Sequence, residues 1–393
     1  MITILIKYSE LTLKGKNRNQ FINWLIDNIK YRLKKEQIDY FIIKKYDHLL
    51  LRLKDDKHED KTYDILKNIP GINTFYPIYI QKLSKEMIIN DLKKIIANID
   101  FNFKFRVTIR NSKFAKDLFL SNQDATIFVA AEIFKIKNDL KVDLKNFDYD
   151  FTLNFTEDNK YYLSVIKYKG IIGLPAGING EGLAMLSGGI DSPVASYLTI
   201  CRGINLSFIS FLTSRTSTKE TLNKIKLLAE KINKFNGKDR FLYLVNFEKM
   251  QAEIANLKAI EYRTILLRRA FFKFANIIAT KEKQKLLVTG DSLGQVSSQT
   301  LESLISINQA SDLFTVRPLI TFAKEDIINL AKKIDTYPIS ILKGEDMCSL
   351  FTPKNPKTKP SNEKVIFFEN KIINYDQILN DIAQRYIRKI KLG

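Results

Sequence analysis

Histidine and cysteine are the scarcest chemically active residues of the sequence. His48 and His58 are the only 2 histidines, and Cys201 and Cys348 are the only 2 cysteines, among 393 residues. Such small numbers exclude a histidine-rich metal centre, a zinc site of several cysteines and a disulfide framework, and they leave little material for a Ser-His-Asp triad. The sequence therefore predicts no metal site built from protein side chains and a reducing, cytoplasmic environment.

Long apolar runs are missing as well. No segment approaches the roughly 20 apolar residues that a membrane span needs, and the longest charge-free stretch, 68–81, contains Pro70 and Pro77. Lysine and arginine number 63 against 43 acidic residues, which gives a formal net charge of +20. We therefore expect no membrane association and a polyanion, nucleic acid above all, as a partner.

The pattern along the chain predicts two small α+β regions followed by a larger α/β region. The first region, 1–60, contains a helix at 18–34 and ends in the charged stretch 55–60. The strands expected before residue 170 are 2–6, 40–43, 49–53, 104–109, 150–155 and 161–166, and the further helices are 61–69, 85–99 and 121–136. After a turn-rich linker at 170–180, strands at 182–186, 205–212, 241–245 and 285–289 alternate with helices, which is typical of a parallel sheet.

The sharpest local motif lies between a predicted strand and a predicted helix. It reads Leu186-Ser-Gly-Gly-Ile-Asp-Ser-Pro-Val194. Adjacent glycines let the backbone curl round an anion, and we expect Ser192 to cap the helix and Pro193 to fit its first turn, so that free N–H groups face phosphate. The motif resembles the PP-loop, Ser-Gly-Gly-x-Asp-Ser, of ATP pyrophosphatases, which cleave ATP between its α and β phosphates; an ordinary capped turn is the alternative. The resemblance implies that the ATP-binding residues include Ser187, Gly188, Gly189, Asp191 and Ser192.

A second loop follows another predicted strand and reads Thr289-Gly-Asp-Ser-Leu-Gly-Gln-Val-Ser-Ser-Gln-Thr300. Loops at the carboxyl ends of neighbouring parallel strands converge on one ligand. Together with Leu13-Lys-Gly-Lys-Asn-Arg18, Leu174-Pro-Ala-Gly177 and Arg317-Pro-Leu-Ile320, this loop makes the chain resemble the ThiI family of tRNA 4-thiouridine synthetases. The resemblance spans nearly the whole chain.

The ThiI resemblance implies a homodimer whose chain has a ferredoxin-like domain at 1–60, a THUMP RNA-binding domain at 61–168 and a PP-loop ATP pyrophosphatase domain at 175–393. We assign Asp191 to metal or phosphate positioning and Lys324 to a phosphate contact. Arg268 could instead be one charge on a solvated helix face. The further ATP contacts that the resemblance implies are Met185, Leu186, Ser210, Phe211, Arg268, Gly290 and Gln299.

Cys348 lies in a polar segment rich in proline and lysine, where a thiol would be exposed and nearby cations would favour the thiolate. By resemblance it matches the family cysteine that accepts persulfide sulfur. Cys201 follows apolar residues late in the helix after the PP-loop, so we expect it in the core. The residues after Cys348 are too few for the rhodanese domain of some family members, and we expect the form that lacks it.

The resemblance implies an ATP-dependent tRNA sulfurtransferase. ATP and Mg²⁺ would adenylate O4 of uridine 8, and a Cys348 persulfide, loaded by a cysteine desulfurase, would replace the oxygen with sulfur; sulfur transfer for thiamine thiazole synthesis is a further role. Two other functions stay open, an amidating PP-loop tRNA modifier and a non-catalytic tRNA-binding protein. Unless they are only part of a generally lysine-rich surface, the expected tRNA contacts are Lys14, Lys16, Arg18, Arg106, Arg110 and Lys113.

Overall fold

The computed structural model describes residues 2–13, 15–99, 101–344 and 351–393. They form two compact units, each taken here by itself. The amino-terminal unit comprises Met1–Arg18 and Arg32–Ile172, and the carboxy-terminal unit comprises Asn19–Tyr31 and Gly173–Gly393. Most of helix α1 (Arg18–Lys35) therefore belongs to the carboxy-terminal unit. Within that unit, Asn28 Nδ2 donates to the carbonyl oxygen of Ala176 at 3.1 Å.

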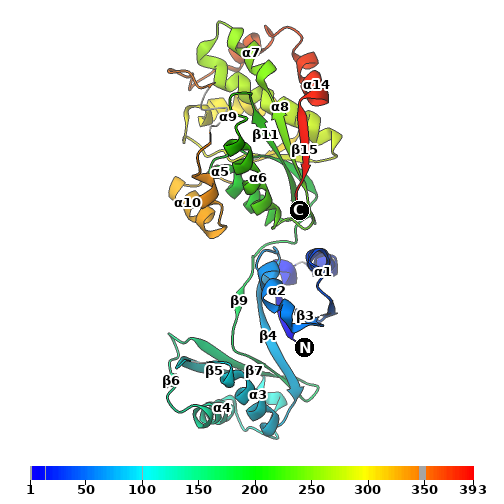
Figure 1. Cartoon of the computed structure of the whole chain (residues 1–393), viewed down its shortest axis with the longest axis vertical. Helices are drawn as coiled ribbons and strands as arrows, with labels where there is room; N and C mark the ends of the chain where they lie inside the picture. Colours follow the sequence, from blue (N-terminus) through cyan, green and yellow to red (C-terminus); the bar gives the residue numbers. More distant parts are fainter. Residues whose placement is uncertain (1, 14, 100, 345–350) are drawn as a thin grey trace. The chain divides into compact units, whose positions relative to one another are not determined.

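The amino-terminal unit is built on one nine-stranded sheet (Figure 1). Its strand order is β2-β3-β1-β4-β8-β7-β5-β6, and β9 pairs with β4 beside this path. The predicted strands in this part of the chain are confirmed as β1, β2, β3, β5, β7 and β8. The strands are β1 (Thr3–Tyr8), β2 (Tyr40–Lys44), β3 (His48–Leu53), β4 (Ile72–Lys82), β5 (Lys104–Arg110), β6 (Lys141–Val142), β7 (Tyr149–Phe155), β8 (Lys160–Ser164) and β9 (Tyr168–Lys169).

Strand β4 was not predicted, although it lies in the middle of the sheet. Pro77 argues against a central strand, because proline lacks the N–H that a ladder hydrogen bond needs. On one side of β4, Pro77 lies opposite Ile4 of β1. On the other side, β4 pairs with β9 before Pro77 and with β8 after it. Pro77 falls between these two pairings, so the sheet tolerates it.

In the described part of this unit, helices α2 (Glu59–Leu66), α3 (Lys85–Ala97) and α4 (Asn122–Ile136) lie against the sheet, and they confirm the helices predicted at 61–69, 85–99 and 121–136. Helix α4 packs on β5, and α3 packs on α4 and β4 (Figure 1). Serine caps begin α3 and α4, since Ser84 and Ser121 each accept a backbone N–H at 3.1 Å. In the core beneath them, Tyr161 Oη donates to the buried Asp91 Oδ2 at 2.6 Å, which gives that carboxylate a partner.

The carboxy-terminal unit has a six-stranded sheet in the order β14-β13-β10-β11-β12-β15. All neighbours are parallel except β15, which is antiparallel to β12. The chain runs outward from β10 through β11 to β12, and it later returns to the other side of β10 through β13 and β14. The strands are β10 (Glu181–Met185), β11 (Asn205–Leu212), β12 (Phe241–Asn246), β13 (Leu286–Val288), β14 (Phe314–Val316) and β15 (Ile387–Lys391). The order therefore reverses between β10 and β13, which is where open α/β sheets bind ligands.

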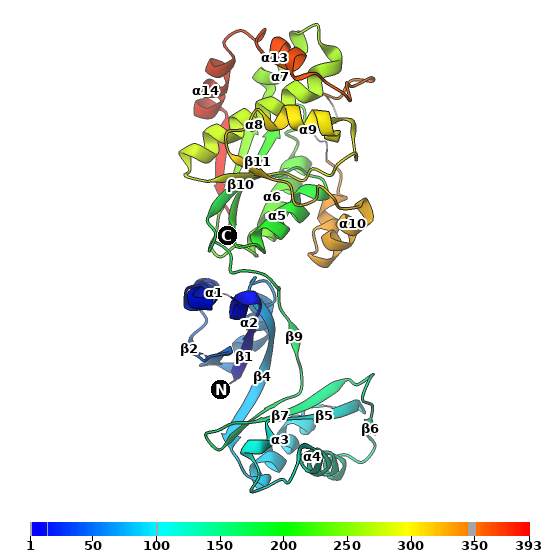
Figure 2. The ribbon, with the colours of Figure 1, turned by 180° about the vertical axis from the view of Figure 1, so that it is seen from behind.

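Helices pack against this sheet in two groups (Figure 2). Helices α5, α6, α10 and α11 contact one another, while α8 contacts α7, α9, α13 and α14. Phenylalanine rings from β11 and α8 join the core, and Phe211 stacks on Phe271 with ring centroids 4.1 Å apart. The helices are α5 (Asp191–Ile200), α6 (Lys219–Asn233), α7 (Glu248–Asn256), α8 (Arg263–Lys281), α9 (Leu301–Asn308), α10 (Lys324–Lys333), α11 (Tyr337–Ser340), α13 (Asn362–Glu369) and α14 (Tyr375–Arg385).

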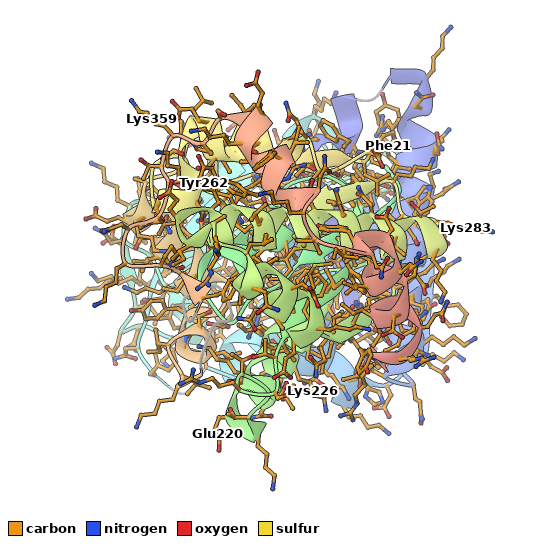
Figure 3. The ribbon with its side chains drawn as sticks, turned by 90° about the horizontal axis from the view of Figure 1, so that it is seen from above. Phe21, Glu220, Lys226, Tyr262, Lys283 and Lys359 are labelled. Carbon is orange, nitrogen blue, oxygen red and sulfur yellow. The ribbon has the colours of Figure 1, made fainter. Side chains whose placement is uncertain are left out.

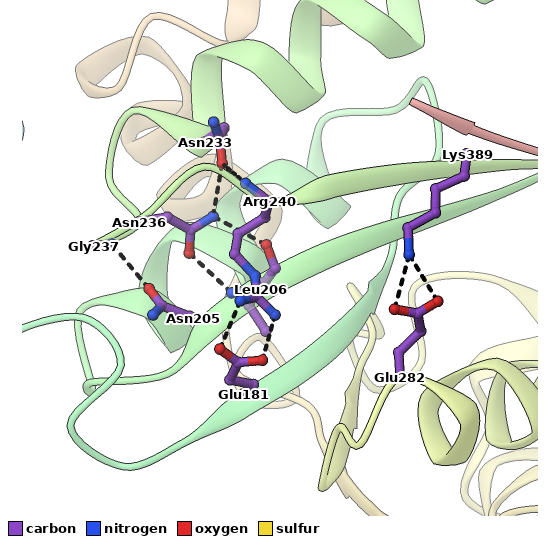
Figure 4. A network of polar contacts seen from close by, with 9 residues as sticks. All are labelled: Glu181, Asn205, Leu206, Asn233, Asn236, Gly237, Arg240, Glu282 and Lys389. Atoms are coloured by element: carbon purple, nitrogen blue, oxygen red, sulfur yellow. Dashed lines mark hydrogen bonds and ion pairs between the residues drawn. The ribbon is translucent and has the colours of Figure 1, made fainter. Parts of the chain in front are cut away.

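Polar side chains form hydrogen bonds at the end of this sheet where β10 and β12 begin (Figure 4). Arg240 Nη1 and Nη2 donate to Glu181 Oε1 and Oε2, each at 2.6 Å. Asn236 bonds both backbone groups of Leu206 nearby. The parallel strands end at the opposite end of the sheet, where open α/β sheets bind ligands.

Lysine side chains are spread over the surface of the carboxy-terminal unit. Lys226, Lys283 and Lys359 are exposed and extend outward (Figure 3). No helix in the described part of the chain is both long and apolar enough to cross a membrane.

Candidate active site

A cavity of about 610 Å³ lies at the carboxyl ends of β10, β11 and β13 in the carboxy-terminal unit. Its size suits a small-molecule ligand. Its position is the topological switch point of the sheet. With the exception of Lys324, every predicted ATP contact lines it: Met185, Leu186, Ser187, Gly188, Gly189, Asp191, Ser192, Ser210, Phe211, Arg268, Gly290 and Gln299.

The PP-loop motif forms the turn from β10 into α5. Ser187 N donates to Ser192 Oγ at 2.9 Å, and Gly189 N donates to Ser187 Oγ at 3.2 Å. The expected capping role of Ser192 is wrong, because α5 begins at Asp191 and the hydroxyl of Ser192 bonds back to Ser187 within the loop. Pro193 does lie in the first turn. The loop is thus pinned to the start of α5, whose dipole favours an anion there.

Gly290 brings the second loop directly against this turn. A Cβ at Gly290 would lie 2.8 Å from Ser192 N and 2.9 Å from the carbonyl carbon of Asp191. Real Cβ atoms do not approach backbone so closely, so only glycine fits. The two motifs found in the sequence are therefore in van der Waals contact.

The carboxylate of Asp191 is held from two sides. Lys324 Nζ, from the first residue of α10, forms an ion pair with Asp191 Oδ1 at 2.5 Å. Gln295 Nε2, from the second loop, donates to Asp191 Oδ2 at 2.9 Å. Lys324, which was predicted to contact phosphate, is thus linked to the site by its ion pair with Asp191. Gln295, which was not predicted as a site residue, lines the cavity.

Asp291 forms a buried cluster with residues of three elements. Its Oδ1 accepts from Arg268 Nη2 at 2.5 Å and from Gln299 Nε2 at 3.4 Å. Its Oδ2 accepts from Thr289 Oγ1 at 2.7 Å and from Arg317 Nε at 3.3 Å. Burial opposes ionisation of Asp291, but the charge of Arg268 and the hydrogen bond from Thr289 outweigh it, so its pKa lies below its usual value. Arg268 therefore is not a free charge on a solvated helix face.

The Asp291 cluster was not found from the sequence. Asp291 stood inside the second motif, next to Gly290, but nothing in the sequence indicated that Arg268 and Arg317 would meet it. Burial lowers the pKa of Arg317, although Asp291 opposes that shift. Arg317 Nη2 and Gln299 Oε1 are buried without a hydrogen-bond partner among the described residues.

Cys348 lies outside the described residues, but the chain on both sides of it contacts the site. Before it, Ser340 Oγ donates to the carbonyl oxygen of Gly189 in the PP-loop at 3.3 Å. The buried Lys224 donates from Nζ to the carbonyl oxygen of Leu342 at 2.8 Å. After it, Thr352 lines the cavity. Described residues before and after Cys348 thus both lie at the predicted nucleotide site.

Cys201 is buried at the end of α5, as expected. Burial raises the pKa of its thiol to about 12. At neutral pH its thiolate fraction is therefore negligible, and it behaves as a core residue.

The predicted tRNA contacts of the amino-terminal unit differ in their surroundings. Lys14 lies outside the described residues, whereas Lys16, Arg110 and Lys113 are exposed. Arg18 stacks over the ring of Tyr46, with 4.0 Å from its Cζ to the ring centroid.

Arg106 differs from these because an acidic side chain neutralises it. It forms an ion pair with Asp150 at 2.6 Å and lies 4.0 Å from the ring centroid of Phe147. Of the predicted tRNA contacts that the structure describes, Arg106 is therefore the one least able to attract a phosphate by its charge.

A second cavity, of about 460 Å³, lies within the amino-terminal unit. Lys7, His48, Tyr76 and Arg110 are among the residues that line it. Burial lowers the pKa of Lys7, and the neighbouring charge of Arg110 lowers it further. Asp47 also lines this cavity and opposes that shift, so the two cations already have an anionic neighbour.

Comparison with known proteins links both units to one family. The family model described as thiamine biosynthesis protein (ThiI) matches residues 177–373, and that of the ThiI ferredoxin-like domain matches residues 3–76. A probable tRNA sulfurtransferase of Malacoplasma penetrans is 37% identical over 391 residues, covering 98% of this chain and 98% of the relative. One of Ureaplasma parvum is 39% identical over 396 residues, covering 99% of each.

A solved structure has the same architecture from end to end. The crystal structure of a 4-thiouridine synthetase–RNA complex with bound ATP matches 100% of both chains with a TM-score of 0.86 and 26% identity. The predicted fold class, a PP-loop parallel-sheet domain preceded by α+β structure, is thereby confirmed, while the boundaries at 60, 168 and 175 stay predictions. The chain belongs to the ThiI family.

Proposed function

We propose that this protein is an ATP-dependent tRNA sulfurtransferase that converts uridine 8 of tRNA to 4-thiouridine. The observation that carries the proposal is the convergence of the PP-loop and the second loop on one cavity, in a chain alike over its whole length to tRNA sulfurtransferases. The ATP and RNA in the similar 4-thiouridine synthetase complex support the same two ligands here.

In the first stage, O4 of the uracil attacks the α-phosphorus of ATP. The new O–P bond forms as the bond between the α-phosphorus and the bridging oxygen breaks, and pyrophosphate leaves with the added negative charge. The PP-loop around Gly188 and Gly189, together with the amino end of α5, is suited to hold that charge. Arg268, which lines the same cavity, is suited to stabilise the charge that develops on the α-phosphate.

Mg²⁺ fits this site as an ion carried mainly by the nucleotide. Asp191 supplies one carboxylate beside the PP-loop, and among the described residues no cluster of three or more metal-binding side chains exists. Mg²⁺ characteristically binds substrate phosphates and only one or two protein carboxylates. When bound, it would neutralise phosphate charge, and Asp191 would hold it.

In the second stage, we propose that a persulfide on Cys348 attacks C4 and expels AMP. The hydrogen bonds of Ser340 and Leu342 before Cys348, and the position of Thr352 in the cavity lining after it, support this role. A cysteine desulfurase would load the persulfide. Cleavage of the remaining sulfur–sulfur bond needs another thiol, and the burial of Cys201 argues that it comes from outside this chain.

The amino-terminal unit is proposed to bind tRNA. Among the described residues, the exposed side chains of Lys16, Arg110 and Lys113 form no ion pair, whereas Arg106 pairs with Asp150. Such charges bind the phosphate backbone, and structured RNA is recognised largely by shape and backbone. We further propose a homodimer in the cytoplasm, and sulfur transfer for thiamine thiazole synthesis, which the description of the matching family suggests.

Mass spectrometry of tRNA nucleosides tests the proposal. The protein would be incubated with unmodified tRNA, ATP, Mg²⁺ and sulfide, and AMP would be measured in parallel. The proposal expects 4-thiouridine at position 8 and one AMP for each. AMP without a sulfur-containing nucleoside would favour an amidating or other PP-loop modifier, and neither product would favour a non-catalytic tRNA-binding protein.

A further inference from the structure

Asp291 is a buried carboxylate of the site that takes no part in the two stages described above. Four side chains nevertheless converge on it: Arg268, Gln299, Thr289 and Arg317. They come from α8, from both ends of the second loop and from the residue after β14. Its side chain is only 4% exposed, so these contacts replace water around it.

The charges of Asp291 and of its two arginine partners determine which hydrogen bonds Asp291 can form. Two guanidinium groups share one carboxylate, which leaves a net charge of +1 beside the cavity. An ionised carboxylate can only accept hydrogen bonds. Asp291 therefore fixes which edge of each partner faces it: Nη2 of Arg268 and the amide nitrogen of Gln299. These contacts hold the guanidinium of Arg268 and the side-chain amide of Gln299 in fixed orientations.

As an anion, Asp291 would repel a phosphate, so a direct contact with the reacting phosphates is unfavourable. Asp291 itself lines the cavity, but each of its two carboxylate oxygens already accepts two hydrogen bonds, so its effect on the reaction passes through these partners. Arg268 and Gln299 line the cavity, and Arg268 is held on its other side by the backbone oxygen of Ser298 at 3.2 Å. Asp291 and Ser298 together restrain the guanidinium in one orientation before ATP arrives.

We propose that Asp291 is a positioning residue for adenylation, which orients Arg268 and Gln299 toward the nucleotide without contacting it. This inference rests on the proposed function, because it assigns a role within the first stage. Pre-oriented donors at developing charge are typically worth about 10²- to 10³-fold in kcat each. Loss of the orientation should therefore slow the chemical step much more than it weakens ATP binding.

The variant Asp291→Asn tests this by keeping the size of the side chain and removing its charge. Pyrophosphate release with tRNA gives kcat and the KM for ATP. We expect kcat to fall roughly 100-fold, with KM within about threefold, because the lost charge is negative and its removal does not weaken phosphate attraction. A rise in KM with unchanged kcat would overturn the inference.

Two double variants separate positioning from folding. In an Arg268→Met background, Asp291→Asn should cost several-fold less than it does in wild type, because one of the two residues through which it acts is already gone and only its contact with Gln299 remains. Asp291→Asn with Arg317→Met restores the net charge of +1, so its thermal midpoint should recover while kcat stays low. If kcat recovers with the midpoint, Asp291 only balances charge, and the inference is wrong.

The wild-type reaction separates this inference from the proposed function. If wild-type protein releases no pyrophosphate with tRNA, the proposed function itself fails, and the inference fails with it. If wild type releases pyrophosphate and Asp291→Asn does so equally fast, the function stands and only the role of Asp291 is refuted.

Discussion

Replacing Gly290 with alanine tests whether ATP binding depends on the contact between the two loops. The new Cβ would lie 2.8 Å from Ser192 N, 2.9 Å from the carbonyl carbon of Asp191 and 3.0 Å from Ser192 Cα. These are backbone atoms at the start of α5, so they cannot rotate away as the tip of a side chain can. Overpacking of this kind typically costs about 1–3 kcal/mol.

We expect much of that cost to appear as displacement of the second loop from the PP-loop, since the loop is less constrained than α5 within the core. One to three kcal/mol corresponds to roughly 5- to 150-fold weaker ATP binding. Calorimetric titration with ATP measures the affinity, and a thermal unfolding curve shows whether the variant is folded. Wild-type affinity in a folded Gly290→Ala protein would refute the reasoning.

Gly294→Ala is the matched control within the same loop. Its φ of +76° disfavours alanine, but a Cβ there meets nothing within 4 Å. The variant should lose about 1–2 kcal/mol of stability through backbone strain and keep its ATP affinity. If both variants weaken ATP binding equally, backbone strain rather than the contact of Gly290 with α5 explains the effect.

Three further predictions concern the sulfur-bearing segment, the second cysteine and the RNA surface. Lys224→Met removes the hydrogen bond to Leu342, so 4-thiouridine formation from a protein persulfide should fall roughly tenfold while tRNA-dependent pyrophosphate release persists; equal loss of both would contradict this. Because burial raises the pKa of Cys201 to about 12, a thiol reagent at pH 8 should modify one cysteine in the native protein and two after unfolding, and two in the native protein would show Cys201 accessible. Charge reversal of Lys16 and Arg110 together should flatten the salt dependence of tRNA binding by about 0.7–0.9 per lost phosphate contact, and an unchanged slope would locate the RNA elsewhere.

The sequence was most informative where local chemistry decides structure. The strand–loop–helix pattern around Gly188 and the loop at Gly290 each predicted a ligand site at the end of a parallel strand, and both line the cavity. Ser84 and Ser121 cap helices α3 and α4, and both helices begin within a residue of the predicted starts. Recurrent apolar spacing likewise located most strands.

Long-range pairing was beyond the sequence. Pro77 suggests that β4 is interrupted. The strand is continuous because Pro77 falls between the residues that pair with β9 and those that pair with β8. In the sequence, nothing distinguishes Asp291 from other carboxylates in loops. Its role depends on Arg268 of α8 and Arg317 after β14, which pair with it only in the folded chain. Ser192 satisfied the rule for a helix cap, yet a nearer partner in Ser187 takes its hydroxyl. In each case tertiary contacts decide between alternatives that are locally equivalent.

A single-turnover comparison of wild type with Cys348→Ser tests the two-stage account most directly. Each protein would receive tRNA, ATP, Mg²⁺ and a cysteine desulfurase with cysteine, and pyrophosphate and 4-thiouridine would be measured in the same reaction. The account predicts that Cys348→Ser releases pyrophosphate as wild type does and forms no 4-thiouridine, because adenylation needs only the cavity whereas sulfur transfer needs the thiol. Normal 4-thiouridine formation by Cys348→Ser would contradict it.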